Sequence, residues 1–247
     1  MKTAQVVFTG CCRAELVESP ARTEALEAHE VIGTTLATII SAGTELAVYQ
    51  GLAGGTYPAH PGYAAVFRID AVGSEVKGFR PGDVAFCMGP HRSFQRTKEE
   101  FVVRVPSEVP PEQAVFARMM AVSMSTLTTT AARPPAAVLV TGLGLVGNLA
   151  AQIFAACGYD VTAVDPLEVR RTIASDSRIG RVFARLTAPP AFVHKLVQSN
   201  TIPRRSHDPD ASAENASAAR RGDSTRKRCS TRTLPSEIQR MAAAMFP

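Results

Sequence analysis

The sequence lacks any long run of apolar residues. No segment of its 247 residues approaches the run of about 18 apolar side chains that a membrane-spanning helix needs. Residues 1–10 contain one lysine and a short β-like apolar run, without the longer apolar core and cleavage site of a secretory signal peptide. We therefore expect neither a membrane-spanning helix nor a secretory leader.

Cysteine is scarce, and its spacing fits neither a disulfide framework nor a metal site. The five cysteines form no C-x-x-C pair, and their number is odd. Secreted disulfide-rich domains use an even number of regularly spaced cysteines. The sequence therefore predicts free thiols in a reducing, cytoplasmic compartment.

Most of the chain also lacks an excess of charge of either sign. The formal net charge is +5, but residues 200–247 hold nine basic and five acidic side chains and so carry +4 of it. The remainder is nearly neutral and has no basic face of the kind that follows nucleic-acid phosphates. Binding of nucleic acid by the basic tail is a weaker alternative, because interleaved aromatic residues are missing there.

What is present divides into stretches of different character. Residues 1–110 contain short apolar or β-branched runs punctuated by Pro-Gly turns, which predicts a small β-barrel or sandwich. The expected strands cover 4–9, 30–40, 63–72, 82–88 and 100–105. Residues 111–135 change to helical spacing, with prolines at both ends, which predicts a linking helix.

The second half of the chain begins as an α/β pattern and then loses its periodicity. Within residues 136–199, the expected elements are strand 137–141, helix 145–157, strand 159–164, helix 168–175 and a short strand at 181–184. Residues 200–247 are rich in Ser, Ala, Arg and Asp. Such a composition buries too little apolar area to offset the entropy of ordering, so a disordered basic tail is predicted.

A glycine-rich turn of the form G-x-G-x-x-G follows the first strand of this α/β pattern. Gly142 permits a tight turn, Gly144 lets the backbone approach a pyrophosphate, and Gly147 lets the next helix pack close to the strand. Leu145 and Val146 begin that helix, whose N-terminal N–H groups suit phosphate oxygens. A turn kept only for packing is the alternative, and the strand–turn–helix context favours dinucleotide binding.

An acidic residue ends the second strand of the pattern. Asp165 lies 23 residues after Gly142, where a dinucleotide-binding fold places the acid that binds the ribose hydroxyls. A carboxylate there repels a 2′-phosphate, which favours NAD over NADP. Arg170 and Arg171 weaken this preference, because either could reach a 2′-phosphate. Residues 137–165 therefore predict the start of a Rossmann domain in an NAD(P)-dependent oxidoreductase.

Three further motifs carry a family resemblance over residues 1 to about 184. They are S-A-G-T-E at 41–45, P-G-Y-A at 61–64 and G-S-E-V-K-G-F-R-P-G-D-V at 73–84. With the glycine turn, they resemble the medium-chain dehydrogenase/reductase superfamily, the zinc alcohol dehydrogenase-like proteins. The resemblance implies an α/β fold with a GroES-like β-barrel and a Rossmann doubly wound sheet. It also implies hydride transfer between a nicotinamide and a small-molecule alcohol or carbonyl substrate.

The motifs depart from the family at its metal ligands. In zinc members a Cys in C-G-T-D and a His in P-G-H-E bind the catalytic metal, and this sequence has Ala42 and Tyr63 there. The acid that follows the His is replaced by Ala64. Because a protein zinc site needs at least three ligands, we predict that no zinc is bound.

The same resemblance suggests two catalytic residues. Thr44 matches the hydroxyl residue that relays the substrate proton, with an ordinary turn hydroxyl as the alternative. Tyr63 could donate a hydrogen bond to the substrate oxygen, with a packed aromatic side chain as the alternative. Glu45 is interpreted as an acid in the first turn of a helix.

The predicted Rossmann domain is incomplete, because two or three expected strands replace the family's six. Residues 200–247 resemble translation of a shifted reading frame in GC-rich DNA, which leads to the hypothesis of a truncated or frameshifted dehydrogenase. Two functions stay open: a zinc-independent oxidoreductase, and an inactive remnant that binds adenine nucleotides or partners weakly. Exposed edges of an open sheet also favour a homodimer.

Overall fold

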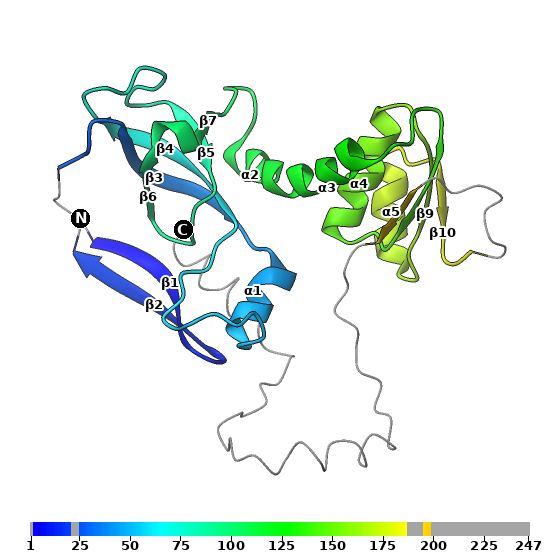
Figure 1. Cartoon of the computed structure of the whole chain (residues 1–247), viewed down its shortest axis with the longest axis horizontal. Coiled ribbons are helices and arrows are strands. Elements are labelled where there is room, and N and C mark those ends of the chain that lie inside the picture. Colours follow the sequence, from blue (N-terminus) through cyan, green and yellow to red (C-terminus); the bar gives the residue numbers. More distant parts are fainter. Residues whose placement is uncertain (1, 21–24, 187–194, 199–247) are drawn as a thin grey trace, which may run out of the picture.

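The computed structural model describes residues 2–20, 25–186 and 195–198. It has two lobes joined by the helices α2 (Pro111–Ala114) and α3 (Ala117–Thr129) (Figure 1). The predicted tail at 200–247 lies outside the described residues. Within them, no helix has the length and apolar character needed to cross a membrane.

The first lobe is built from two antiparallel sheets, as the β-rich composition predicts. One is a hairpin of β1 (Lys2–Gly10) and β2 (Arg13–Pro20). The other has the strand order β6-β3-β4-β5-β7. Its strands are β3 (Glu30–Ile39), β4 (Ala64–Val72), β5 (Val84–Cys87), β6 (Phe94–Lys98) and β7 (Val102–Arg104), with a 3-10 turn, η1 (Glu99–Phe101), before the last.

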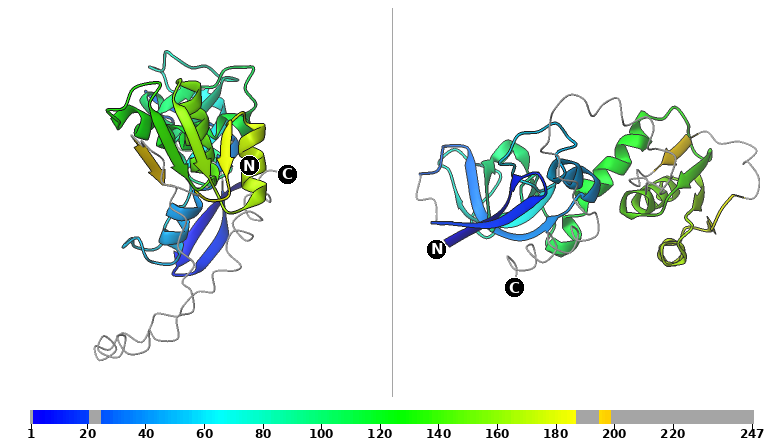
Figure 2. Two further views of the ribbon diagram at one scale, coloured as in Figure 1. Left: turned by 90° about the vertical axis from the view of Figure 1, so that its right-hand side faces the viewer. Right: turned by 90° about the horizontal axis from the view of Figure 1, so that it is seen from below.

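The larger sheet curls because its two central strands are irregularly paired. The register between β3 and β4 shifts at Ile32/Gly33 and again at Thr35/Ala37. A Cβ at Gly33 would overlap the backbone of Arg68, so only glycine allows this approach. Val31, Phe67 and Ile69 fill the concave side with other buried residues. The result is the curled half-barrel expected of a GroES-like domain (Figure 2).

Helix α1 (Ala42–Tyr49) closes one end of this lobe, and the sequence indicated only its first turn, through Glu45. Tyr49 at its C-terminal end makes an edge-to-face contact with Phe8 of β1, with ring centroids 5.3 Å apart. Phe8 also forms a β-bridge with Ala59. The hairpin, α1 and the loop before β4 therefore share one small core.

The linking segment differs from the single helix expected at 111–135. It is two helices, since α2 ends at Ala114 and α3 begins at Ala117, although Val115 and Phe116 between them keep αR backbone angles. The helical geometry ends at Thr130, whose backbone is extended (φ −82°, ψ 142°). Pro134 and Pro135 follow shortly, and proline lacks the N–H that a continuing helix needs.

The second lobe is a parallel sheet with the order β10-β9-β8-β11. Its elements are β8 (Ala137–Thr141), α4 (Leu145–Ala156), β9 (Asp160–Val164), α5 (Glu168–Asp176), β10 (Arg181–Phe183) and β11 (Lys195–Gln198). The first five lie within a residue or two of the sequence prediction. The fourth strand, β11, was not predicted.

This strand order places a topological switch point between β8 and β11. The chain proceeds from β8 to β9 and β10 on one side, and β11 then pairs with β8 on the other side. Open α/β sheets bind ligands beyond the carboxyl ends of their strands at such a point. The turn that follows β8 lies there, so the fold draws attention to residues 142–147.

Candidate functional site

The glycine turn has the geometry that its sequence predicts. Gly142 adopts a positive φ of 83°, which lets the chain turn sharply out of β8. Its N–H donates to the carbonyl oxygen of Val164 over 2.8 Å and so anchors the turn to β9. Gly147 is buried within α4. The turn is therefore fixed between two strands and a helix.

The N-terminus of α4 is open for a ligand. Gly144 is its N-cap residue, and no side chain caps the helix. A Cβ built on Gly144 would meet no heavy atom of the described residues within 4 Å. The first intrahelical bond runs from the N–H of Asn148 to the carbonyl of Gly144 over 2.8 Å, so the N–H groups of Leu145, Val146 and Gly147 precede it. These features fit a pyrophosphate.

Asp165 lies beside this turn, but its carboxylate is engaged by the protein. The residue is only 2% exposed. Its Oδ2 accepts the N–H of Leu143 and its Oδ1 accepts the N–H of Leu167, each over 2.8 Å. In this structure, the acid expected to meet a ribose ties the glycine turn to the segment before α5.

Two arginines of α5 approach Asp165 in different ways. Arg170 forms an ion pair with Oδ2 over 3.4 Å and keeps 38% of its side chain exposed. Arg171 donates to the carbonyl oxygens of Asp165 and Pro166 over 2.9 and 2.8 Å. Burial raises the pKa of Asp165, but the hydrogen bonds from Leu143 and Leu167 and the Arg170 guanidinium lower that pKa more, so it falls below its usual range. The carboxylate is therefore ionised at neutral pH, and Arg170 covers it.

Tyr63 connects the first lobe to the glycine turn. It packs against a cluster of buried residues from β3, β4 and α3, and Val146 of α4 packs against the same cluster. The guanidinium of Arg118 lies over its ring, 4.6 Å from the centroid. Tyr63 is thus a half-buried packing residue in the same cluster as the start of α4.

Thr44 and Ala42 lie on the exposed side of α1, in its first turn. The hydroxyl of Thr44 is 3.1 Å from the hydroxyl of Ser41, the N-cap residue. Tyr57, on the loop before β4, donates its hydroxyl to the carbonyl of Val48 over 2.6 Å. Burial, with smaller contributions from the two neighbouring cysteines, raises the pKa of Tyr57. Of these hydroxyls, Thr44 is the exposed one.

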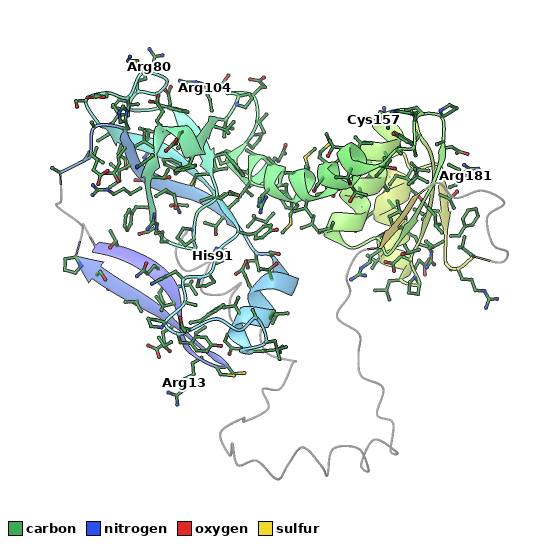
Figure 3. All side chains as sticks on the ribbon, in the orientation of Figure 1. Arg13, Arg80, His91, Arg104, Cys157 and Arg181 are labelled. Carbon is green, nitrogen blue, oxygen red and sulfur yellow. The ribbon has the colours of Figure 1, made fainter. Side chains whose placement is uncertain are left out.

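A buried polar group beneath Thr44 was missed by the sequence reasoning. Glu45 is 4% exposed and His91 is fully buried. The His91 Nε2 lies 3.0 Å from Glu45 Oε2, its Nδ1 lies 2.8 Å from Thr38 Oγ1, and Glu45 Oε1 accepts the N–H of Ser41 over 2.7 Å. Figure 3 labels His91 beside α1. Glu45 is thus more than a first-turn acid, because it joins α1 to the barrel.

Among residues 2–20, 25–186 and 195–198, no group of three or more His, Cys, Asp or Glu side chains could hold a metal ion. Ala42 and Tyr63 offer no ligand of the kind that zinc prefers. His60 is exposed on the loop before β4.

A comparison with protein-family models finds no match, and a comparison with curated proteins finds none either. Solved structures do match. A protein described as a zinc-binding dehydrogenase from Sinorhizobium meliloti 1021, bound to NADP, has a TM-score of 0.67 at 14% identity over 74% of this chain and 62% of its own. Acetophenone reductase from Geotrichum candidum NBRC 4597 in complex with NAD gives 0.66 at 20% identity over 75% and 64%. Galactitol-1-phosphate dehydrogenase from Escherichia coli gives 0.64 at 21% identity over 73% and 60%.

These likenesses establish the fold. A GroES-like barrel followed by a Rossmann sheet is confirmed, and the chain has the fold of the medium-chain dehydrogenases and reductases. The chain spans about three fifths of the length of the solved structures that it matches.

Proposed function

We propose that this chain, with the fold of the medium-chain dehydrogenases and reductases, is a zinc-independent NAD(P)-dependent oxidoreductase for a small-molecule alcohol or carbonyl compound. The observation that carries the proposal is the N-terminus of α4 at the switch point of the sheet, where Val146 packs in the same cluster as Tyr63 of the barrel. When bound, NAD(P) supplies hydride chemistry. The protein's own residues bind it, orient the substrate and handle the proton.

The glycine turn and the first residues of α4 hold the pyrophosphate in this proposal. Gly142 sets the turn and Gly144 leaves room for the phosphates, while the N–H groups of Leu145, Val146 and Gly147 face them. The space where a Cβ of residue 144 would lie is free of atoms of the described residues within 4 Å. Phosphates can therefore approach without a change of the backbone.

Asp165 and Arg170 select the adenosine ribose. Movement of the half-exposed Arg170 side chain uncovers Asp165, whose oxygens each have a second lone pair for a ribose hydroxyl. NAD is preferred, since a 2′-phosphate would lie against an ionised carboxylate. Arg170 moderates this preference, whereas Arg171 is held by backbone carbonyls.

Tyr63 and Thr44 are the proposed proton-handling groups. Tyr63 borders the α4 end of the site, and its hydroxyl orients the substrate oxygen. Thr44 is exposed on α1 and adjoins the Ser41 hydroxyl, which gives a short relay to solvent. Zinc is dispensable in this scheme, because Ala42 and Tyr63 stand where a metal would need ligands.

We also propose the organisation of the whole chain. Residues 1–110 form the GroES-like barrel, 111–135 the link and 136–199 a partial Rossmann domain, while the basic segment 200–247 lies outside the described residues. The outer strands β10 and β11 leave sheet edges on which two copies can pair as a homodimer. A cytoplasmic location accords with the free cysteines.

A second candidate is a nucleotide-binding protein without turnover. It is favoured by one observation: the part of the chain that the structure describes supplies the turn, Asp165 and Arg170, all of which serve the adenosine side of a dinucleotide. Such a protein would bind adenine nucleotides or partners and transfer no hydride.

One titration separates the two candidates. NADH, NADPH and ADP-ribose are titrated into the full chain, with cofactor fluorescence and calorimetry as readouts. Clearly tighter binding of NADH than of ADP-ribose supports the oxidoreductase, because only NADH carries the nicotinamide. Equal binding of the two supports the nucleotide-binding candidate. Absence of binding by all three contradicts both.

A further inference from the structure

The guanidinium of Arg118 packs on an aromatic ring, and one of its N–H groups is buried without a hydrogen-bond acceptor among the described residues. Arg118 is the second residue of α3 and is half-buried. Its Cζ lies 4.6 Å from the centroid of the Tyr63 ring. Its Nε is shielded from solvent and has no hydrogen-bond partner among the described residues. The ring thus fixes the plane of the guanidinium without satisfying its N–H groups.

Such an arrangement is chemically specific. Arginine stays charged in proteins, so burial does not remove its charge. Buried donors without acceptors are rare in folded proteins, and one on a charged group is costly. The planar fork of N–H groups matches two oxygens of a carboxylate or phosphate. A supported guanidinium with a free buried donor is therefore suited to an oxyanion.

The position of Arg118 connects it to the proposed cofactor site. Five residues further along α3, the hydroxyl of Ser123 donates to the carbonyl of Val146 over 3.1 Å. Five residues of α-helix span about 7–8 Å. Arg118 therefore lies about 7–8 Å along the α3 axis from this contact between α3 and α4. Tyr63, on which it rests, packs in the same cluster as Val146.

We propose that Arg118, oriented by Tyr63, binds an oxyanionic group of the substrate, so that the substrate is an alcohol or carbonyl compound bearing a carboxylate or phosphate. This inference rests on the proposed function, because it takes the space beside α4 to be the substrate's. The cofactor phosphates have backbone N–H groups of α4 available to them, whereas Arg118 stands on a barrel residue. The barrel side is where the substrate enters in this scheme.

The test uses small probes on the full chain. Oxalate, inorganic phosphate and the neutral analogue oxamide are titrated by calorimetry into wild type, R118Q, R118K and R13Q. Wild type is expected to bind oxalate or phosphate and to bind oxamide far more weakly. R118Q should lose about tenfold or more in affinity for the anion. R118K should fall between them, because it keeps the charge and loses the fork.

R13Q is the matched control. Arg13 is exposed at the start of β2, and Figure 3 shows it pointing away from the protein at the tip of the hairpin. Its loss should leave anion binding unchanged. Equal anion affinity of wild type and R118Q overturns the proposal, as does a wild type that binds neither oxalate nor phosphate.

ADP-ribose distinguishes the substrate from the cofactor as the source of the oxyanion. R118Q should bind ADP-ribose as wild type does. A parallel loss of ADP-ribose affinity would assign Arg118 to the cofactor phosphates and overturn the proposal. Failure of wild type to prefer NADH over ADP-ribose counts against the oxidoreductase itself, and the anion titrations report on Arg118 independently of that result.

The unfolding midpoint of R118M distinguishes anion binding from a packing role, because the two roles predict opposite shifts. R118M keeps most of the side chain's length and removes the unpaired N–H. Its unfolding midpoint should equal or exceed that of wild type, because the cost of the unsatisfied donor disappears. A midpoint well below wild type would make Arg118 a packing residue and contradict the proposal.

Discussion

At the scale of single residues, Asp165 is a buried carboxylate held by three donors. The N–H groups of Leu143 and Leu167 and the guanidinium of Arg170 all face its oxygens. The first two come from different sides, so the carboxylate clamps the glycine turn to the start of α5. Its role in binding a ribose would be added to this structural role.

We expect Asp165→Asn to lower the free energy of unfolding by about 1.5–3 kcal/mol at neutral pH, because hydrogen bonds to a charged acceptor are lost. The pKa of Asp165 is lowered in the folded state. The wild-type advantage is therefore complete above the ordinary Asp pKa of about 3.9 and is lost as the pH falls through the lower folded-state pKa. Urea unfolding from pH 3 to 8 measures this difference.

Asp176→Asn is the control for that substitution, because Asp176 is exposed at the end of α5. It should change stability by less than about 0.5 kcal/mol. A difference between wild type and D165N that stays constant from pH 8 down to pH 3 would contradict the assignment of an ionised, hydrogen-bonded carboxylate.

The site residues that the sequence predicted belong to a local pattern. The residues that it missed are paired with side chains far away along the chain. Gly142 and Asp165 belong to one strand–turn–helix–strand pattern that can be recognised locally. Glu45 and His91 are 46 residues apart. Nothing in either local sequence indicates the other, because the pairing is created by the curl of the sheet. The engagement of Asp165 by the N–H groups of Leu143 and Leu167 was also missed, because the motif identifies the acid and not its hydrogen-bond partners.

At the scale of elements, α1 is held on the barrel by the His91–Glu45 pair. His91→Phe would leave the buried Glu45 carboxylate without its partner and should lower the free energy of unfolding by about 3–5 kcal/mol. Amide hydrogen exchange in α1 should quicken more than exchange in β3. Faster exchange in α1 alone indicates local release of the helix. Equally faster exchange in α1 and β3 indicates destabilisation of the whole barrel.

A second His–Glu pair provides a matched control. His29 and Glu75 are joined by the same atoms over the same 3.0 Å as His91 and Glu45, but both side chains are 62% exposed. His29→Phe should have no measurable effect on stability, because exposed pairs contribute little. Similar losses from the two substitutions would mean that burial does not decide the contribution of these pairs.

The turn before α4 gives a prediction about binding at the same scale. Gly144→Ala should fold normally, because the added Cβ meets no atom within 4 Å, yet it should weaken NADH binding at least about tenfold by occupying space proposed for the pyrophosphate. Gly180→Ala also adds a Cβ into open space, away from the turn. It should leave the affinity unchanged. Equal NADH affinity of G144A and wild type would remove the pyrophosphate from this position.

Elements were predictable where their burial is regular. β8, α4 and β9 pack their regularly spaced apolar residues in one core, and their bounds were found within a residue or so. β2 and β6 are rich in polar and charged residues and are strands because β1 and β3 pair with them. α1 begins Ala-Gly-Thr, which has little helical signal of its own. Tertiary pairing, absent from local sequence, decides these elements.

At the scale of the molecule, the order of barrel, link and α/β sheet follows from the motifs, whereas the extent of the sheet does not. β11 has four residues and pairs with β8 on the side opposite β9. So short a strand carries no recognisable period. Its pairing nevertheless creates the switch point that makes the glycine turn a candidate ligand site. The switch point was therefore visible only in the fold, whereas the glycine turn that lies there was predicted from the sequence.

The whole molecule also provides the test of zinc independence. Protein prepared in the presence of zinc and then dialysed should contain well below one zinc per chain by atomic absorption. Incubation with EDTA should leave both the unfolding midpoint and NADH affinity unchanged, because a bound structural or catalytic zinc would couple to folding or to ligand binding. Cobalt, as a spectroscopic substitute, should produce no thiolate charge-transfer band. About one tightly held zinc per chain would refute the proposal, since it would require three protein ligands from residues other than Ala42 and Tyr63.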